Sequence, residues 1–334
     1  MTILVTGGAG FIGSHTCVEL AGNGYDVAVV DDFSNCLPGV MDALRQITGR
    51  QIAVHRCDIR DTAALAEVFD SHDVSAVIHF AAKKAVGEST LIPLEYFDVN
   101  IGGTVSLLRV MASREVNKLV FSSSCSIYGD GYSRPIAEGD QPEPANPYAR
   151  SKLVCEQIIE AAQAANPDLA AISLRYFNPA GAHPSGHIGE RPHGIPGNIV
   201  PHIMKVAAGQ LEKLHIFGGD YDTADGTAVR DYIHVMDVAQ AHVLALEHLE
   251  DRNGPRALNL GTGRGLSVLE LVKAFEEACG ISLPYTVTGR RPGDVASLVA
   301  DAGLARKLWG WQPSQDVKDL LRDAWRFEQV NRSG

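Results

Sequence analysis

A glycine-rich segment follows the first apolar run of the chain and limits the possible folds more than any other feature. Residues 3–6 are β-branched or apolar and are bounded by a turn, which predicts a short buried strand. Residues 6–13 (TGGAGFIG) satisfy both G-x-G-x-x-G and G-x-x-G-x-x-G. Glycines at this spacing let the backbone turn tightly and approach a pyrophosphate, while the next helix offers its N–H groups and positive dipole end. The segment therefore predicts a dinucleotide-binding turn.

An acidic residue at the end of the next apolar run strengthens this interpretation. Asp31 lies 18 positions after Gly13, close to the spacing of a ribose-binding carboxylate. A carboxylate there accepts hydrogen bonds from both ribose hydroxyls and repels a 2′-phosphate, so NAD is favoured over NADP. The alternative is that Asp31 only caps the next turn.

The first part of the chain alternates strand and helix patterns. Strands are predicted at residues 3–6, 27–30, 53–55, 74–79, 119–122 and 171–175, and helices near 12–22, 61–70, 99–114 and 148–165. This alternation predicts an α/β fold with a Rossmann-type, doubly wound parallel sheet.

The sequence pattern of alternating strands and helices ends after Phe177. Residues 178–197 are rich in Gly, Pro and His, and a loop of that length in a compact domain is usually functional. Shorter mixed elements follow, with helices predicted near 198–208, 235–250, 266–279 and 315–329. We expect an NAD-binding domain at residues 1–177 and a smaller α/β substrate-binding lobe at 178–334. Some elements of the lobe are expected to return to the main sheet.

Composition excludes several classes of protein. Lys plus Arg is 29 against 40 for Asp plus Glu, and this net charge of −11 argues against binding to nucleic acid or to anionic membranes. A hydrophobic share of 45% indicates a globular chain, and no apolar run is long enough to span a bilayer. The six cysteines have no C-x-x-C spacing, and no signal peptide is visible, so we expect reduced thiols and a cytoplasmic protein.

No metal site is predicted. His183, His187 and His193 lie close together in the sequence, but their spacing follows no helical or zinc-type pattern. The neighbouring Pro and Gly residues indicate packing within a loop instead.

A serine, a tyrosine and a lysine are placed for proton chemistry. Ser124 lies just beyond the buried strand at 119–122, and Tyr148 and Lys152 are four residues apart on one predicted helix face. An ordinary tyrosine pKa is about 10, and a nearby ammonium and a positive nicotinamide ring would both favour the phenolate. A Y-x-x-x-K pair alone is common on exposed helix surfaces, but the dinucleotide turn upstream favours a catalytic role.

Further motifs extend this pattern along the chain. They are residues 5–16 (VTGGAGFIGSHT), 77–82 (VIHFAA), 84–89 (KAVGES), 174–179 (LRYFNP), 181–186 (GAHPSG) and 229–235 (VRDYIHV). Together they resemble the extended short-chain dehydrogenase/reductase family. The resemblance to its nucleotide-sugar 4-epimerases runs through nearly the whole chain.

The resemblance implies reversible interconversion of UDP-glucose and UDP-galactose in galactose metabolism, with tightly bound NAD. Tyr148 would take the proton from the sugar O4 while hydride passes from C4 to the nicotinamide. The resulting 4-keto sugar would then receive the hydride on its other face. Lys152 would bind the nicotinamide ribose and lower the tyrosine pKa, and Ser124 would hydrogen-bond O4.

The resemblance also implies binding residues, a partner and one open question. Cofactor contacts would come from Gly7, Gly10, Phe11, Ile12, Gly13, Asp31, Asn35, Asp58, Ile59, Phe80, Lys84, Asn100, Ser124, Tyr148, Lys152 and Phe177. Substrate contacts would come from Ser124, Tyr148, Asn178, Asn198, Phe217, Arg230, Arg291, Asp294 and Leu298. Family members are commonly homodimers, here through the helices near 99–114 and 148–165. Leu298 lies where members differ in side-chain bulk, which leaves acceptance of N-acetylhexosamines open.

Three alternatives remain. One is a UDP-N-acetylglucosamine 4-epimerase or another NAD-dependent nucleotide-sugar-modifying enzyme. Another is a nucleotide-sugar 4,6-dehydratase or decarboxylase, of which the dehydratase is disfavoured because Ser124 is followed by Cys125 and Ser126 rather than by an Asp-Glu pair. A non-catalytic, NAD-responsive regulator on the same fold is disfavoured because it would not need a Ser-Tyr-Lys set.

Overall fold

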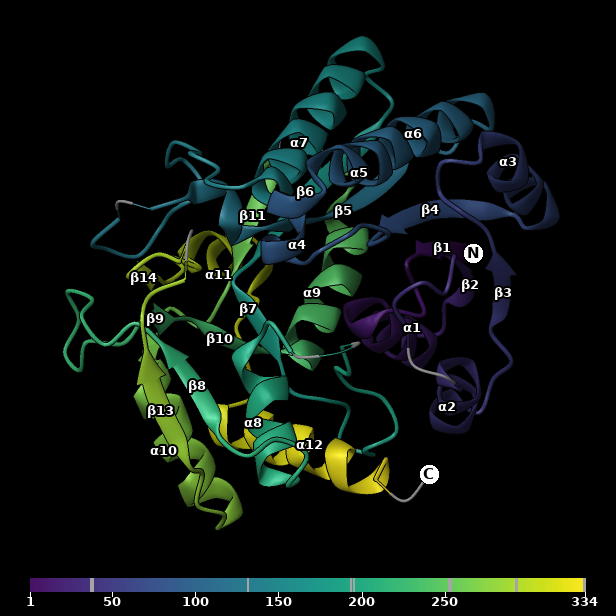
Figure 1. Ribbon diagram of the computed structural model, residues 1–334. Coiled ribbons are helices and arrows are strands. Elements are labelled where there is room, and N and C mark those ends of the chain that lie inside the picture. The colour runs from purple at the N-terminus through teal and green to yellow at the C-terminus, as the bar shows by residue number, and fades with distance from the viewer. Residues whose placement is uncertain are drawn as a thin grey trace. The chain divides into compact units, whose positions relative to one another are not determined.

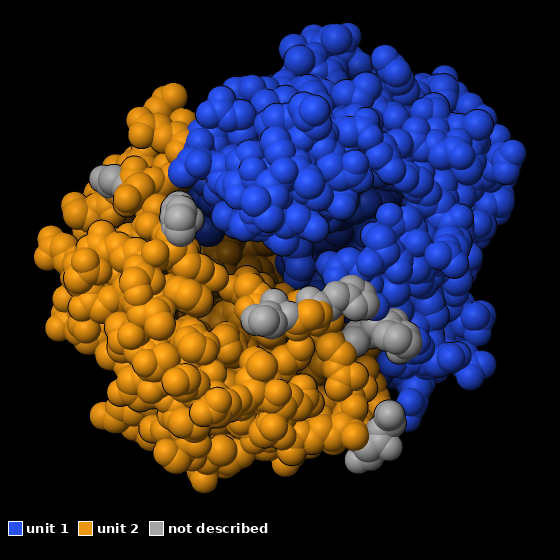
Figure 2. Space-filling model, in the orientation of Figure 1, with its two compact units in different colours: residues 1–127, 144–175, 239–258 blue, residues 128–143, 176–238, 259–334 orange. Residues whose placement is uncertain are grey.

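The computed structural model describes residues 1–36, 39–130, 132–192, 194, 196–251, 254–291 and 294–332. It forms two compact units, coloured blue and orange in Figure 2. Unit 1 comprises residues 1–127, 144–175 and 239–258, and unit 2 comprises residues 128–143, 176–238 and 259–334. The chain therefore passes between the units at several points, one of them between Arg175 and Tyr176, whereas the sequence-based division is a single boundary after Phe177.

A seven-stranded sheet forms the centre of the fold, with strand order β11-β6-β5-β4-β1-β2-β3 (Figure 1). The strands are β1 (Thr2–Thr6), β2 (Asp26–Asp31), β3 (Ala53–Arg56), β4 (Val74–His79), β5 (Lys118–Ser124), β6 (Ala170–Tyr176) and β11 (Ala257–Leu260). Pairing is parallel from β3 through β2, β1 and β4 to β5. The strand order reverses between β1 and β4, which is where dinucleotide-binding sheets place their ligand. The predicted Rossmann-type fold is confirmed.

Helices connect these strands. They are α1 (Phe11–Gly22), α2 (Val40–Thr48), α3 (Thr62–Ser71), α4 (Val86–Leu91), α5 (Pro93–Phe97), the π-helical turn η1 (Asp98–Gly102), α6 (Gly103–Ser113), the 3₁₀ turn η2 (Cys125–Tyr128), α7 (Pro147–Ala165) and α9 (Val235–His248). The helices predicted near 12–22, 61–70, 99–114 and 148–165 are all present, whereas α2, α4 and α5 were not predicted. Apolar side chains from both the sheet and α3, α6 and α7 form the core of unit 1.

The start of α7 is fixed by its own sequence. The Asn146 side chain accepts a hydrogen bond from the Ala149 N–H at 2.9 Å, so Asn146 caps the helix. Pro147 occupies the first helical turn, where its missing N–H is not needed. This cap places Tyr148 in the first turn of the helix, with Lys152 one turn further on.

Unit 2 is built from short strands and from helices around a second core. Its strands are β7 (Asn178–Ala180), β8 (Leu214–Phe217), β9 (Val229–Arg230), β10 (Tyr232–His234), β12 (Leu266–Ser267), β13 (Tyr285–Thr288) and β14 (Ser297–Leu298). Its helices are α8 (Ile199–Ala207), α10 (Val268–Cys279), α11 (Gly303–Trp309) and α12 (Val317–Val330). Three of these helices, α8, α10 and α12, lie where the sequence predicts them. No helix in the described part of the chain is long and apolar enough to cross a membrane.

Candidate active site

The glycine turn is shaped by close backbone packing. Gly7 has a φ of +72°, and a Cβ there would lie 2.6 Å from the Ala81 N atom. A Cβ on Gly13 would overlap the Gly7 carbonyl oxygen. A Cβ added to Gly10 would lie 3.2 Å from the Gly7 carbonyl oxygen. Gly10 is also the N-cap of α1, and within the described residues no side chain makes a capping hydrogen bond there. The first N–H groups of α1 are thus open to an anion, which fits a pyrophosphate.

Asp31 lies at the carboxyl end of β2, beside the glycine turn. Its Oδ2 accepts a hydrogen bond from Ala9 N at 3.0 Å, and its Oδ1 accepts one from Phe33 N at 2.9 Å. Burial raises the pKa of this carboxyl, while the two N–H donors oppose the rise. Asp31 therefore shapes the local turn, as the alternative interpretation holds, and is also held where a ribose-binding acid is expected.

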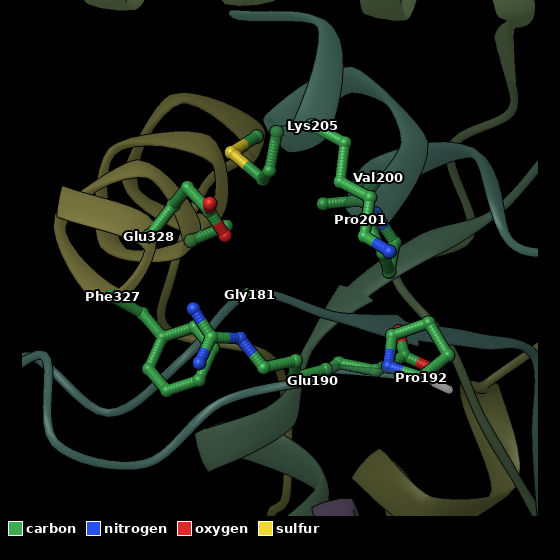
Figure 3. A pocket seen from close by; sticks show the side chains of 11 residues that line it. Gly181, Glu190, Pro192, Val200, Pro201, Lys205, Phe327 and Glu328 are labelled. Carbon is green, nitrogen blue, oxygen red and sulfur yellow. The ribbon is translucent and has the colours of Figure 1, made fainter. Parts of the chain in front are cut away.

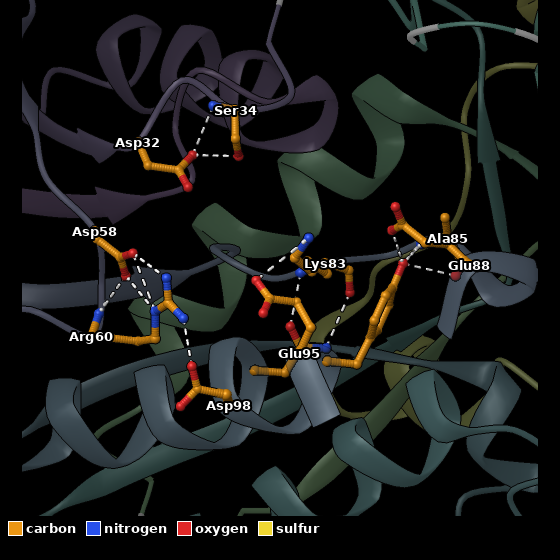
Figure 4. A network of polar contacts seen from close by, with 11 residues as sticks. Asp32, Ser34, Asp58, Arg60, Lys83, Ala85, Glu88, Glu95 and Asp98 are labelled. Atoms are coloured by element: carbon orange, nitrogen blue, oxygen red, sulfur yellow. Dashed lines mark hydrogen bonds and ion pairs between the residues drawn. The ribbon is translucent and has the colours of Figure 1, made fainter. Parts of the chain in front are cut away.

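Asp58 and its neighbours form a charged network (Figure 4). The Arg60 guanidinium lies 2.6 Å from Asp58 Oδ2 and 2.5 Å from Asp98 Oδ2. Hydrogen bonds from Arg60 lower the pKa of Asp58. Asp58 is thus an anion at neutral pH, and one of its oxygens also accepts the Arg60 N–H at 2.8 Å, as a strand-end cap would.

Asn100 holds the segment after β4 in place. Its Oδ1 accepts from Lys83 N at 2.8 Å, and its Nδ2 donates to Lys83 O at 3.1 Å and to Ser151 Oγ at 2.9 Å. The neighbouring Lys84 Nζ lies 5.8 Å from the centroid of the Phe11 ring. The predicted cofactor residues of this segment and of the glycine turn therefore meet.

The remaining cofactor candidates differ in exposure. Ile59 is buried in the core of unit 1, and Asn35 is exposed just after β2. The Phe80 ring packs on His242 at a centroid distance of 4.7 Å. Phe177, by contrast, belongs to unit 2, where its N–H donates to Leu260 O at 3.0 Å.

The candidate catalytic trio comes from β5 and α7. Ser124 is the last residue of β5, and its Oγ accepts from Ser126 N at 3.2 Å. Burial raises the pKa of Tyr148 to about 12, and a hydrogen bond with Ser124 opposes the rise. Lys152 is buried, and its Nζ donates to Ser122 O at 2.7 Å. The structure therefore brings all three candidates together.

The electrostatics of Tyr148 and Lys152 involve different neighbours. Burial raises the pKa of Tyr148, a hydrogen bond with Ser124 lowers it, and Cys125 adds to the rise. The Lys152 ammonium points instead to a backbone oxygen and to the Phe121 ring, 4.9 Å away. Burial lowers the pKa of Lys152 to about 8. The effect of Lys152 on the Tyr148 pKa stays a prediction.

A buried histidine lies behind the trio. His79 Nδ1 is 2.7 Å from Thr6 Oγ1, and its Nε2 is 3.1 Å from Thr104 Oγ1. Because Thr104 donates its hydroxyl proton to Asn100 O, we assign the Nε2–H tautomer. Burial, with a smaller effect from Lys152, lowers the pKa of His79 to about 3, so the ring is neutral. His79 was not predicted as a site residue, because nothing in its spacing distinguishes it from a core side chain.

Unit 2 carries the other substrate candidates, several of which meet. Arg291 Nε lies 2.9 Å from Asp294 Oδ2, and its guanidinium carbon lies 4.8 Å from the Phe217 ring centroid. Arg230 and Leu298 are paired on the adjacent strands β9 and β14. The charges of Arg230, Arg291 and Asp294 all act on Tyr221, which places these groups in one region. The sequence did not predict Tyr221 as a residue of the substrate site.

Two asparagines in unit 2 differ in their partners. Asn198 Nδ2 donates to Glu190 Oε1 at 2.9 Å, so its orientation is fixed. Asn178 Oδ1 is buried and has no hydrogen-bond partner among the described residues. A buried amide oxygen without a donor is costly, which is consistent with a ligand hydroxyl or N–H at this point.

Two other features of unit 2 do not form a site. A cavity between α8, α12 and the segment near Glu190 has a volume of about 20 Å³ (Figure 3), enough for a single water. No group of three or more His, Cys, Asp or Glu side chains in the described residues could hold a metal ion. His183 bonds Ser185 Oγ at 2.8 Å, and His193 lies outside the described residues.

The fold and the glycine turn together define an α/β protein of the dinucleotide-binding Rossmann class. Residues 3–261 match the model of the NAD dependent epimerase/dehydratase family, and the chain belongs to this family.

Named relatives extend over the full chain. This chain is 48% identical over 334 residues to a UDP-glucose 4-epimerase from Bacillus subtilis, and the match covers 100% of this chain and 98% of the relative. A crystal structure of UDP-glucose-4-epimerase from Stenotrophomonas maltophila, with bound NAD and formylated UDP-arabinopyranose, is 49% identical with a TM-score of 0.97 and full coverage of both chains. A crystal structure of UDP-glucose 4-epimerase from Bifidobacterium longum, in complex with NAD+ and UDP, has 46% sequence identity to this chain and a TM-score of 0.96. The match covers 100% of both chains.

Proposed function

We propose that this protein is an isomerase that interconverts UDP-glucose and UDP-galactose at C4 with NAD as its cofactor. The observation that carries the proposal is the joint placement of Ser124, Tyr148 and Lys152 at the end of β5 and the start of α7. This arrangement occurs in a chain whose full-length relatives at 48% and 49% identity are UDP-glucose 4-epimerases.

The residues of unit 1 fit an NAD molecule. The open N-terminus of α1 suits the pyrophosphate, and the Asp31 carboxylate suits the adenosine ribose. When bound, NAD supplies the reversible hydride acceptor for C4 of the hexose, and its nicotinamide ring adds a positive charge. We propose that the unit 1 candidates from Gly7 to Asn100, together with Phe177, contact the cofactor.

Tyr148 would hold and release the proton of the hexose O4. With a pKa of about 12 in the protein alone, the phenol is mostly protonated at neutral pH and is a weak base. A positive charge close to the ring lowers that pKa, and Ser124 already hydrogen-bonds the phenol oxygen. We propose that Ser124 orients O4 and that Lys152 binds the nicotinamide ribose.

Unit 2 would bind the UDP portion of the substrate. Arg230 and Arg291 carry guanidinium groups whose geometry suits a diphosphate, and Asp294 holds Arg291 in place. The unpaired Asn178 oxygen would accept a hydrogen bond from the substrate. We propose that binding energy is concentrated on UDP through these residues, Asn198, Phe217 and Leu298, so that the 4-keto sugar can turn over.

A homodimer is also proposed. Leu91 and Leu94, on α4 and α5, are 81% and 80% exposed, and both helices pack on α7. Val105 and Ile158, on α6 and α7, are half-buried, as expected at a seam between two copies. A monomer mass by light scattering would contradict the dimer. A cytoplasmic location is also proposed, and it agrees with the absence of disulfide bonds among the described cysteines.

The decisive experiment incubates the purified protein with UDP-galactose, without added NAD, and separates the UDP-sugars by chromatography. Formation of UDP-glucose is the expected result, and it would also show that NAD is retained. No conversion of UDP-galactose, with or without added NAD, would overturn the proposed function.

A further inference from the structure

Glu156 is a buried carboxylate to which the proposed reaction assigns no role. It lies on α7 and is only 3% exposed. The hydroxyl of Ser123, on β5, donates a short hydrogen bond to Glu156 Oε1. Because a buried carboxylate is costly unless it is fully paired, its partners define what it holds in place.

The counter-ion of Glu156 comes from the next strand of the sheet. Arg175 of β6 donates from Nη2 to Glu156 Oε2 at 2.6 Å and from Nε to Oε1 at 3.0 Å. This is a two-pronged, charge-assisted contact, and both side chains are buried. Through Glu156, α7 is therefore joined to β5 by Ser123 and to β6 by Arg175.

The same face of α7 makes three successive contacts with β5. Tyr148, Lys152 and Glu156 follow each other at four-residue spacing. Tyr148 hydrogen-bonds Ser124, Lys152 donates to Ser122 O, and Glu156 accepts from the serine between them. Three consecutive residues at the end of β5 are thus each tied to one turn of the helix.

We propose that Glu156 is a positioning residue for the reaction, with Arg175 as its counter-ion. Its carboxylate would hold the end of β5 in register with α7 and so set the position of Ser124 relative to Tyr148. The proposal rests on the function proposed above. A displacement of about 1 Å between reacting groups can lower a rate by about 100-fold, so a group outside the reacting set can control kcat.

Glu156 also acts on the charge of Lys152. Cys155 and Glu156, both on the same helix as Lys152, oppose the burial that lowers the Lys152 pKa to about 8. From the other elements, the neutral His79 of β4 interacts with Lys152, and the Arg175 cation of β6 faces Glu156. Removing the Glu156 charge is expected to lower the Lys152 pKa further, so the ammonium would be lost at lower pH.

The first test is Glu156→Gln in the full-length protein, with Glu160→Gln as the matched control. Glu160 lies one turn further along α7 and is exposed. For Glu156→Gln we expect kcat for UDP-galactose to fall by roughly 10- to 100-fold with KM nearly unchanged. We also expect the alkaline limb of the kcat–pH profile to move to lower pH. The control should show wild-type values, and a wild-type kcat and pH profile in Glu156→Gln would overturn the proposal.

Two further variants distinguish a role of Glu156 in positioning the reacting groups from a role in the stability of the fold alone. Glu156→Gln combined with Arg175→Met removes both charges, so folding should recover relative to the single variant. If kcat and the pH profile also recovered, Glu156 would only balance Arg175, and the proposal would be wrong. Ser123→Ala leaves the ion pair intact, and we expect a smaller fall in kcat at unchanged KM. An unchanged kcat in Ser123→Ala would likewise count against the proposal.

The two failures are distinguishable. If wild-type protein does not convert UDP-galactose, the proposed function is wrong. If wild-type protein converts it and the Glu156 variants match it, only the positioning role is wrong.

Discussion

The candidate catalytic residues of unit 1 and the candidate substrate residues of unit 2 are held in different ways. In unit 1, Lys152 is almost fully buried and donates to Ser122 O, and the half-buried Tyr148 hydrogen-bonds Ser124. In unit 2, the Arg291 side chain is 44% exposed and is held mainly by Asp294. Asn178 keeps a buried oxygen for which no partner is found in the described residues.

This difference matches the two tasks of a 4-epimerase. Proton and hydride transfer need reacting groups fixed to within fractions of an ångström, which buried and fully bonded side chains provide. Binding a diphosphate needs charged groups that can exchange an internal partner for the ligand, which exposed arginines do at low cost. Variants in unit 1 should therefore change kcat or stability, and variants in unit 2 should change KM.

The largest effect is expected for Tyr148→Phe. Removal of the phenol oxygen takes away the group that accepts the O4 proton, so kcat should fall by about 1,000-fold or more. NAD content and the unfolding midpoint should stay close to wild type, because the aromatic ring remains. Turnover of UDP-galactose measures the loss, with Tyr25→Phe, a half-buried tyrosine elsewhere in unit 1, as the control. Substantial residual activity would remove Tyr148 from its proposed role.

The next effect concerns stability at low pH. The His79 pKa is about 3 in the folded protein against 6.5 in the unfolded chain. Since the unfolded state binds the proton more readily, this contribution is complete above pH 6.5 and is lost as the pH falls towards 3. At about 1.4 kcal/mol per pKa unit, the loss amounts to roughly 3 kcal/mol by pH 4.

The measurement compares denaturant unfolding of wild type and of His79→Asn between pH 7 and pH 4. The variant should be less stable at pH 7, and the difference between the two proteins should shrink as the pH falls. A difference that stays constant over this range would mean that His79 does not titrate as its burial implies.

A smaller effect is expected for the unit 2 arginines. Arg230→Gln and Arg291→Gln each remove a charged donor to the diphosphate, which is worth about 1.5–3 kcal/mol, or roughly 10- to 100-fold in KM for UDP-galactose. Because neither residue is proposed to touch the reacting carbon, kcat should change much less. Arg322→Gln, an exposed arginine on α12 paired with Asp319, is the control. A loss confined to kcat would contradict the division of tasks between the units.

The sequence predicted the secondary structure around the unit 1 site better than that around the unit 2 site. The glycine turn and Asp31 were recognised from their spacing, and Tyr148 and Lys152 lie on the 19-residue helix α7, whose start is fixed by the cap at Asn146. Many strands of unit 2 are only two to four residues long, for example β9 and β14, so they have too few residues to show a period.

Sequence patterns do not predict the direction in which a side chain points. Helical spacing places Tyr148 and Lys152 on one face, but it does not show that the Lys152 ammonium points to Ser122 O. For the same reason the Glu156–Arg175 pair was missed, because its two residues are 19 positions apart and belong to different elements.

The smallest effect is expected at Leu298, which tests how loosely unit 2 holds the sugar. Leu298 lies on β14, half-buried and paired with Arg230. If this side chain limits the space at C2 of the hexose, Leu298→Tyr should lower kcat/KM for UDP-N-acetylgalactosamine relative to UDP-galactose, and Leu298→Ala should raise it. One or two methylene groups of pocket volume correspond to about 1–3 kcal/mol of discrimination. The ratio of the two kcat/KM values in each variant is the measurement. Equal ratios in all three proteins would show that another residue limits the space at C2.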